Sequence, residues 1–317
     1  MTEPLVLVAP ALIRPALEPH IPSSVVPHWF ASRDEGLARA PLADIGWFDM
    51  GDPRLMADVI TAATRMRWLN TLFAGLDMMP TALLAERGVT LTSGKGLNAL
   101  AVADYAVLGV LTLAKRFDEV VRARDRHEWL TAAPGQGELD GSKALVVGMG
   151  EIGSAIAARL AAFGVTVTGV RRTADPVSGV IGPDDWKPRL GEYDWVILAA
   201  PSTDSTKALL GAAEFAAMKA GSGFINIARG DMVDQDALIA ALDAGTPAAA
   251  FLDVTDPEPL PPGNPLWGVR NCLISMHMSG RSQTSVYAGA ARRFLANLGR
   301  YVAGEPLHHM VDLARGY

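Results

Sequence analysis

The sequence predicts an α/β protein built from two doubly wound parallel-sheet domains. Three observations lead to this expectation. Short apolar runs alternate with helical patterns twice along the chain, a stretch rich in Gly, Pro and Ala separates the two alternations, and a glycine-rich turn opens the second one. Alternating strands and helices are typical of parallel sheets with helices on both faces, and 317 residues are enough for two cores.

The first alternation fills the N-terminal part of the chain. Helical spacing is clear in RLMADVITAATRM and in MPTALLAERG, and the second pattern stops at Gly88, a residue type that commonly ends helices. Buried strands are expected in four apolar runs around these helices: PLVLVAPAL from Pro4, IGWFDM from Ile45, RWLNTLF from Arg67 and VTLTS from Val89.

The middle of the chain predicts one long helix from about Asn98 to Arg126, apolar at first and then charged. The segment TAAPGQGELDGSK after it is expected to be a loop. A second alternation follows, with six apolar runs and helical material between most of them: ALVVGMG, VTVTGVR, DWVILAAP, GFINIARG, AAAFLDV and NCLISMH. Six such runs describe a complete doubly wound sheet.

The first of these runs leads into a glycine-rich turn that predicts a dinucleotide site. Strand, turn and helix follow one another as this fingerprint requires. The first glycine permits a tight turn, the second lets the backbone approach a pyrophosphate, and the third lets helix and strand pack closely. Free amides at the helix N-terminus then meet the anion. The residues of the turn are Gly148, Met149, Gly150, Glu151, Ile152 and Gly153.

The end of the next strand indicates which dinucleotide is bound. An NAD site usually places an acid about twenty residues after the glycines, where it accepts the ribose hydroxyls. This chain has Arg171, Arg172 and Thr173 there instead. Two cations and a hydroxyl suit a 2′-phosphate, so NADP is the preferred cofactor and NAD remains possible.

Polar residues follow three later strands and predict a catalytic group. Arg229 comes after GFINIA, Asp253 near the end of AAAFLD, and His277 after NCLISM, while Glu258 lies in a proline-rich loop. An arginine can hold a carboxylate in a fork and polarise the neighbouring carbonyl. A histidine can donate and accept a proton near neutral pH, and a glutamate beside it favours the imidazolium. Arg229, Glu258 and His277 therefore suit reduction of a 2-oxo acid.

The segments NIARGDMVDQDAL, FLDVTDPEPLP with PLW, and SMHMSG resemble the signature segments of D-isomer-specific 2-hydroxyacid dehydrogenases. The resemblance implies a Rossmann cofactor domain at residues 98–284, inserted in a flavodoxin-like substrate domain at residues 1–97 and 285–317. It also implies that Arg229 clamps the substrate, that His277 is the acid/base and that Glu258 is its partner. Further cofactor contacts are implied at Pro201, Thr206, Ala228, Asp253 and Gly280.

The resemblance extends to the substrate side and to assembly. Phe73, Ala74 and Gly75, within the segment FAGLD, resemble the family loop whose amides hold the substrate carboxylate, together with Arg229 and His277. Trp47 and the closing VDLARGY resemble the glyoxylate/hydroxypyruvate reductase A branch, which prefers NADPH; Trp47 equally fits core packing. The interdomain helix implies a homodimer. Met276 stands where the family usually has proline, and Asp104 where relatives commonly have glutamate.

Composition excludes several other classes of function. The net charge is −6, and no Lys- or Arg-rich run is present, so neither nucleic acid nor an anionic membrane is an expected partner. The single cysteine, Cys272, allows no intrachain disulfide, and the histidines lack metal-ligand spacing, so we expect a cytoplasmic protein without a metal. Two alternatives stay open: a dehydrogenase for a bulkier or phosphorylated acid, and a non-catalytic NADP(H)-sensing protein.

Overall fold

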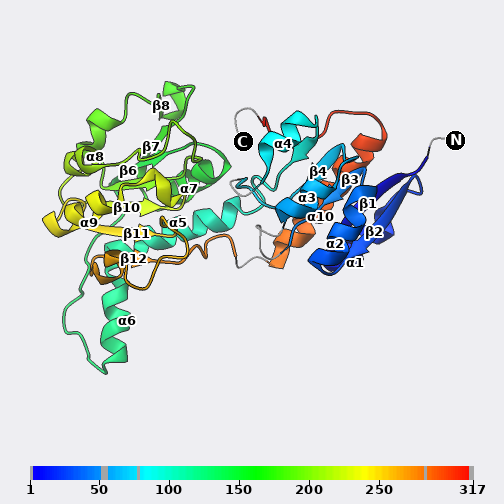
Figure 1. Ribbon diagram of the computed structural model, residues 1–317. Coiled ribbons are helices and arrows are strands. Elements are labelled where there is room, and N and C mark those ends of the chain that lie inside the picture. Colours follow the sequence, from blue (N-terminus) through cyan, green and yellow to red (C-terminus); the bar gives the residue numbers. More distant parts are fainter. Residues whose placement is uncertain (1–2, 51–55, 77–78, 282–283, 314–317) are drawn as a thin grey trace. The chain divides into compact units, whose positions relative to one another are not determined.

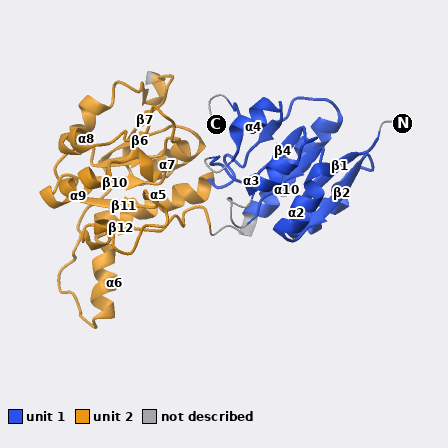
Figure 2. Ribbon diagram, viewed as in Figure 1, with its two compact units in different colours: residues 1–98, 283–317 blue, residues 99–282 orange. Residues whose placement is uncertain are grey.

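The computed structural model describes residues 3–50, 56–76, 79–281 and 284–313. The chain forms two compact units (Figure 2). Unit 1 comprises residues 1–98 and 283–317, and unit 2 comprises residues 99–282. Each unit carries its own parallel sheet, which confirms the predicted fold class. The described part of the chain has no helix whose length and apolar character would let it cross a membrane.

Unit 1 is built on a five-stranded parallel sheet (Figure 1) in the order β2-β1-β3-β4-β5. The strands are β1 (Leu5–Pro10), β2 (Val25–Phe30), β3 (Ile45–Trp47), β4 (Trp68–Asn70) and β5 (Thr90–Thr92). The sequence did not predict β2, because Pro27 and His28 interrupt its apolar pattern. Proline is tolerated in β2 because this strand lies at the edge of the sheet.

Helices cover both faces of this sheet. They are α1 (Arg14–Leu17), α2 (Arg33–Arg39), α3 (Met56–Ala62), α4 (Thr81–Glu86) and the C-terminal α10 (Thr284–Val302). The apolar face of α10 returns to unit 1 and packs on the sheet. The Phe294 ring stacks on Trp68, with ring centroids 5.0 Å apart, and contacts Trp47 at 5.1 Å. These aromatic contacts lie within one of the two hydrophobic clusters of unit 1.

Unit 2 contains a seven-stranded parallel sheet in the order β12-β11-β10-β9-β6-β7-β8. The strands are β6 (Lys143–Val147), β7 (Thr166–Val170), β8 (Val180–Ile181), β9 (Trp195–Leu198), β10 (Gly223–Asn226), β11 (Ala249–Leu252) and β12 (Cys272–Ile274). The six predicted strands are present, and β8 is an unpredicted two-residue strand. The strand order reverses between β6 and β9, the position where open α/β sheets bind ligands.

The helices of unit 2 are α5 (Ala99–Lys115), α6 (Phe117–Asp125), α7 (Glu151–Ala162), α8 (Ala212–Ala217) and α9 (Gln235–Ala244). The prediction of one helix from Asn98 to Arg126 was therefore wrong. Arg116 has a left-handed backbone (φ 48°) and separates α5 from α6. The later loop causes this break, because the Gly137 amide binds the Ala114 carbonyl at 3.1 Å and Gly135 lies against the backbone of Lys115.

Candidate active site

The predicted cofactor and catalytic residues of unit 2 all follow the carboxyl ends of its strands. Because the strands are parallel, these ends lie at one edge of the sheet. The glycine-rich turn follows β6, and Arg171 follows β7. Pro201 and Thr206 come after β9, Arg229 after β10, Asp253 after β11 and His277 after β12. The fold therefore brings these segments to the same side of unit 2.

The glycine-rich turn has the geometry that a pyrophosphate site needs. Gly148 has a φ of 109°, and a Cβ there would lie 2.5 Å from the Ala200 nitrogen. A Cβ on Gly153 would lie 2.0 Å from the Gly148 carbonyl oxygen, so only glycine lets α7 pack this closely. Gly150 is the N-cap of α7, makes no side-chain cap, and has open space where a Cβ would be. The first-turn amides of α7 are thus left for an anion.

The neighbouring segments are arranged around this turn. Met149 packs on Gly169 of β7, Glu151 is exposed and Ile152 is partly buried. Arg171, Arg172 and Thr173 are all exposed at the end of β7. After β9, the Thr206 hydroxyl binds the Pro201 carbonyl at 2.9 Å and the Thr203 amide at 2.7 Å, so it closes this loop on itself.

His277 and Glu258 form a direct pair. Nδ1 of His277 lies 2.7 Å from Oε2 of Glu258, and the two side chains are 39% and 36% exposed. The Thr255 amide donates to the other carboxylate oxygen at 3.1 Å. Burial alone would raise the pKa of Glu258. The hydrogen bond and charge of His277, the Thr255 amide and the charge of Arg229 outweigh it, so this pKa is lowered. Glu258 is therefore held as a carboxylate beside the imidazole.

The loop that carries His277 is held by the buried Asp253, which is 1% exposed. Oδ1 of Asp253 accepts hydrogen bonds from the Ser275 hydroxyl at 2.6 Å and from the Met278 amide at 2.9 Å. Met276 and His277 both have left-handed backbones, with φ of 55° and 54°. Proline cannot adopt a positive φ, so this loop has a conformation that excludes proline at position 276. Gly280 follows in the same loop and is partly buried.

Asn226, which no sequence motif singled out, holds the turn before Arg229. This asparagine is 1% exposed; its amide nitrogen donates to the Arg229 carbonyl at 2.9 Å, and its oxygen accepts from the Ala228 amide at 3.0 Å. Ala228 is 6% exposed and packs in the core. The Arg229 guanidinium donates to the Ala228 carbonyl at 2.7 Å. An asparagine that ends a buried strand was the available signal.

Unit 1 carries the loop after β4, where the sequence predicts substrate contacts. Phe73 and Gly75 are partly buried and Ala74 is exposed, whereas Asp77 of the same segment lies outside the described residues. Trp47 corrects the expectation of a substrate contact. It has no exposed surface and packs against Phe294 in the core, so it has no face to offer a ligand. Core packing was the alternative that the sequence left open.

This set of groups can bind an anionic oxo acid and move one proton. The arginine supplies a fixed positive charge, and the imidazole supplies an exchangeable proton beside a carboxylate that favours its charged form. Both groups lie on the sheet edge that carries the glycine-rich turn.

Comparison with known proteins identifies the family. Residues 107–279 match the model of the D-isomer specific 2-hydroxyacid dehydrogenase NAD-binding domain. The chain is 34% identical over 250 residues to a glyoxylate reductase/hydroxypyruvate reductase of Mus musculus, covering 75% of each chain. It is 28% identical to a D-3-phosphoglycerate dehydrogenase of Archaeoglobus fulgidus, over 82% of this chain and 47% of that one.

A solved structure agrees with these sequence matches. The D-isomer specific 2-hydroxyacid dehydrogenase of Xanthobacter autotrophicus, in complex with NADPH and MES, superposes with a TM-score of 0.78 at 27% identity, covering all of both chains. The family resemblance is confirmed, while assignment to the A branch of the reductases stays a prediction. The chain therefore belongs to the D-isomer specific 2-hydroxyacid dehydrogenase family and is an oxidoreductase with an NAD(P)-binding domain.

Proposed function

We propose that this protein is an NADPH-dependent reductase of small 2-oxo acids of the glyoxylate and hydroxypyruvate type. The observation that carries the proposal is the His277–Glu258 pair, 2.7 Å apart, on the sheet edge that also presents Arg229 and the glycine-rich turn. A protein that only sensed the nucleotide would not need a proton-transfer pair in addition to the nucleotide site.

The nucleotide would be held by the turn at residues 148–153, with Arg171, Arg172 and Thr173 near its ribose. The open space at Gly150 and the uncapped first turn of α7 fit a pyrophosphate, and the exposed guanidinium groups fit a 2′-phosphate. When bound, the nicotinamide supplies a hydride to the substrate carbonyl carbon. We also assign contacts with the bound nucleotide to residues at this edge of the sheet: Pro201, Thr206, Ala228, Asp253 and Gly280.

The remaining chemistry belongs to side chains of this protein. In unit 2 we assign Arg229 to binding the substrate carboxylate and polarising the carbonyl. In unit 1 we assign the amides of Ala74 and Gly75 to binding a substrate carboxylate. Protonated His277 donates its proton to the carbonyl oxygen, and Glu258 stabilises the imidazolium before that transfer. In the reverse direction His277 accepts the hydroxyl proton.

We also propose that the protein is a homodimer through α5 and α6. These helices expose large apolar side chains, which water would otherwise solvate at a cost. Leu108 is 49% exposed and Phe117 57%, and Leu108 also lines an apolar groove with Val107, Leu111 and Phe163. Trp129, just after α6, is 92% exposed.

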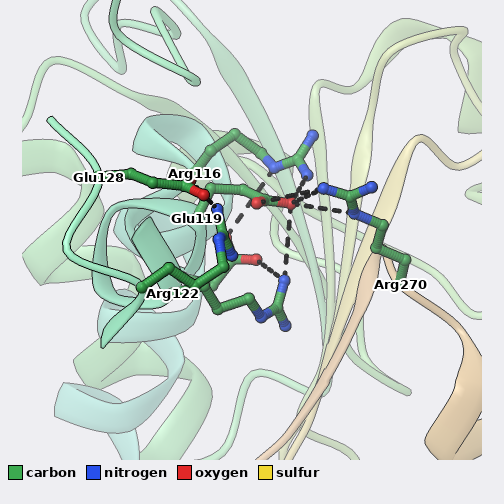
Figure 3. Close-up of polar contacts among 7 residues, drawn as sticks. Arg116, Glu119, Arg122, Glu128 and Arg270 are labelled. Atoms are coloured by element: carbon green, nitrogen blue, oxygen red, sulfur yellow. Dashed lines mark hydrogen bonds and ion pairs between the residues drawn. The ribbon is translucent and has the colours of Figure 1, made fainter. Parts of the chain in front are cut away.

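A charged cluster holds α6 in place (Figure 3). Glu119 lies 3.1 Å from Arg116, 3.6 Å from Arg122 and 3.2 Å from Arg270, which belongs to the segment before β12. Burial would raise the pKa of Glu119, but the charges of these arginines outweigh it and lower it. Because this cluster joins α6 to the segment before β12, the apolar residues of α6 form a fixed surface suited to a second copy.

Initial rates of NADPH and NADH oxidation with several oxo acids test the proposed function. Fast oxidation of NADPH in the presence of glyoxylate and of hydroxypyruvate is the expected result. Turnover only with an aryl pyruvate or a phosphorylated hydroxypyruvate would keep the chemistry and replace the substrate. Nucleotide binding without oxidation by any oxo acid would favour the sensing function instead.

The cofactor preference has its own test in Arg171→Asp. A carboxylate at the end of β7 repels a 2′-phosphate and accepts ribose hydroxyls, so the preference should move from NADPH toward NADH. Each charge-assisted hydrogen bond to a phosphate is worth about 1.5–3 kcal/mol, so a change of roughly tenfold or more is expected in the ratio of kcat/KM values. An unchanged ratio would remove Arg171 from nucleotide selection.

A further inference from the structure

Asp49 is a buried carboxylate in unit 1 to which neither the proposed chemistry nor the comparisons give a role. It lies two residues after β3 and is 9% exposed. A carboxylate is rarely buried without a specific set of donors, because its loss of hydration costs several kcal/mol. The donors around Asp49 therefore indicate what it does.

Three donors meet this carboxylate, and two of them belong to the loop after β4. Oδ2 accepts from the Leu72 amide at 2.6 Å and from the Trp47 indole at 2.5 Å. Oδ1 accepts from the Thr71 hydroxyl at 2.7 Å. The Thr71 hydroxyl in turn accepts from the Phe73 amide at 3.1 Å. Asp49 thus orients two successive amides of the loop, one directly and one through Thr71.

Gly94 holds the same loop from the other side. Its amide donates to the Phe73 carbonyl at 3.0 Å, and a Cβ at Gly94 would lie 1.7 Å from the Leu72 carbonyl oxygen. The next two amides, of Ala74 and Gly75, donate no hydrogen bond within the described part of the chain. Leu72 and Phe73 are therefore fixed, and the two amides that follow them remain available.

We infer that Asp49 is a positioning residue for the substrate carboxylate. By holding Leu72 and Phe73, it sets the direction of the Ala74 and Gly75 amides, which bind that carboxylate in the proposed function on which this inference rests. Its own negative charge is engaged by three donors, which limits its repulsion of an anionic substrate. A loop held before the substrate arrives binds with less entropic cost than one that must be ordered.

The test compares Asp49→Asn with Asp44→Asn. An NH₂ group in place of Oδ2 would face both the Leu72 amide and the Trp47 indole, and in place of Oδ1 it would face the Thr71 hydroxyl, which must then turn to accept. In either orientation the negative charge that strengthens these hydrogen bonds is lost. Asp44 precedes the same strand and is 8% exposed, and it binds the Val6 amide at 2.8 Å and Arg65 at 2.9 Å rather than the loop. It is therefore a matched buried carboxylate at the other end of β3.

In D49N we expect KM for glyoxylate to rise roughly tenfold, the size of one lost hydrogen bond to a charged group, with kcat and NADPH affinity nearly unchanged. D44N should keep the wild-type KM. Thr71→Val should raise KM in the same direction as D49N, and Thr71→Ser, which retains the hydroxyl, should restore it. An active D49N with the wild-type KM would overturn the inference and leave the proposed function intact.

Hydrogen exchange of the Leu72 and Phe73 amides gives a second measurement that needs no turnover. Both should exchange faster in D49N than in the wild type, and should be unchanged in D44N. Equal exchange in D49N and the wild type would overturn the role of Asp49. Failure of the wild type to reduce any oxo acid would instead overturn the proposed function, and with it the substrate part of the inference.

Discussion

His277 and Glu258 are 19 positions apart in the sequence, and a 2.7 Å contact joins them. Their partners are backbone and buried carboxylate groups: Thr255 binds Glu258, and Asp253 holds the loop of His277. Such pairs of an imidazole and a supporting carboxylate keep the ring oriented and its charged form stabilised. The residues that surround the pair therefore fix the positions of the carboxylate and of the loop that carries the imidazole.

Replacing His277 with Ala should lower turnover by about 10²–10⁴-fold, because general acid–base catalysis contributes about this much. NADPH affinity should remain, since the glycine-rich turn is untouched. Stopped-flow NADPH oxidation and fluorescence titration measure the two quantities. His20→Ala, at an exposed position of unit 1, is the control and should retain wild-type rates. Wild-type turnover in H277A would remove this residue from the mechanism.

Asp49 gives a prediction for pH. Burial raises its pKa to about 6 and outweighs the hydrogen bonds from Thr71, Leu72 and Trp47. The native pKa lies above the ordinary value of 3.8, so the folded chain binds this proton more tightly than the unfolded chain does. The resulting contribution to the free energy of unfolding is fully present below pH 3.8 and is lost as pH rises through about 6.

The free energy of unfolding of the wild type, relative to D49N, should therefore fall by roughly 2 kcal/mol between about pH 4 and pH 7. Urea unfolding of both proteins across this range measures the difference, and the other carboxylates cancel because both proteins contain them. A difference in the free energy of unfolding that does not change with pH would contradict the raised pKa of the buried Asp49.

At the scale of elements, the strand β6, its turn and helix α7 act together. The approach of α7 to the strand depends on the missing side chain of Gly153, where a Cβ would lie 2.0 Å from the Gly148 oxygen and 3.2 Å from Val146. The same turn places the N-terminus of α7, which is 12 residues long, toward the ligand edge of the sheet. A side chain at position 153 is therefore expected to disturb both the packing of α7 on β6 and the binding of the nucleotide.

Gly153→Ala should displace α7 and weaken NADPH binding by roughly tenfold or more, since the clash is with backbone that has no room to rotate away. Gly299→Ala is the control: Gly299 lies within α10, and nothing is within 4 Å of the position of its Cβ. This control should raise the free energy of unfolding by up to about 1 kcal/mol, because alanine favours a helix interior. Calorimetric titration with NADPH and thermal unfolding separate the two effects. Equal nucleotide affinity in both variants would show that the close approach is dispensable.

At the scale of the whole molecule, each unit has its own sheet and core, and unit 2 in addition presents the apolar surface of α5 and α6. Leu108 on α5, Phe117 on α6 and Trp129 just after α6 are large apolar side chains that are exposed to water. In the proposed dimer these side chains would be removed from water.

Light scattering should give a mass of twice the 33.5 kDa chain for the wild type. The double variant Leu108→Asp and Phe117→Asp should give the mass of one chain, because burying two charges in the interface is less favourable than leaving them in water. Val177→Asp is the control, since Val177 is 99% exposed and lies in the segment between β7 and β8. A monomeric wild type would contradict the proposed dimer.

Much of this organisation could be predicted from local patterns. The turn from β6 to α7, the order of strands and helices, and the polar groups that follow β10, β11 and β12 all depend on neighbouring residues, whose periodicity and glycine spacing are visible in the sequence. The roles of Arg229, Glu258 and His277 stay predictions that the kinetic experiments decide.

Other features depended on residues far apart in the chain. Pro27 argued against a strand at β2, because proline is tolerated only in edge strands and the local pattern does not show which strand lies at an edge. The break at Arg116 depends on Gly135 and Gly137, and the place of Trp47 in the core depends on Phe294. The carboxylates of Asp49 and Asp253 accept hydrogen bonds from amides 23 and 25 positions away, which only the folded chain brings within reach. Local periodicity reports what a segment prefers, whereas burial and hydrogen bonding between distant segments exist only once the sheet has brought them together.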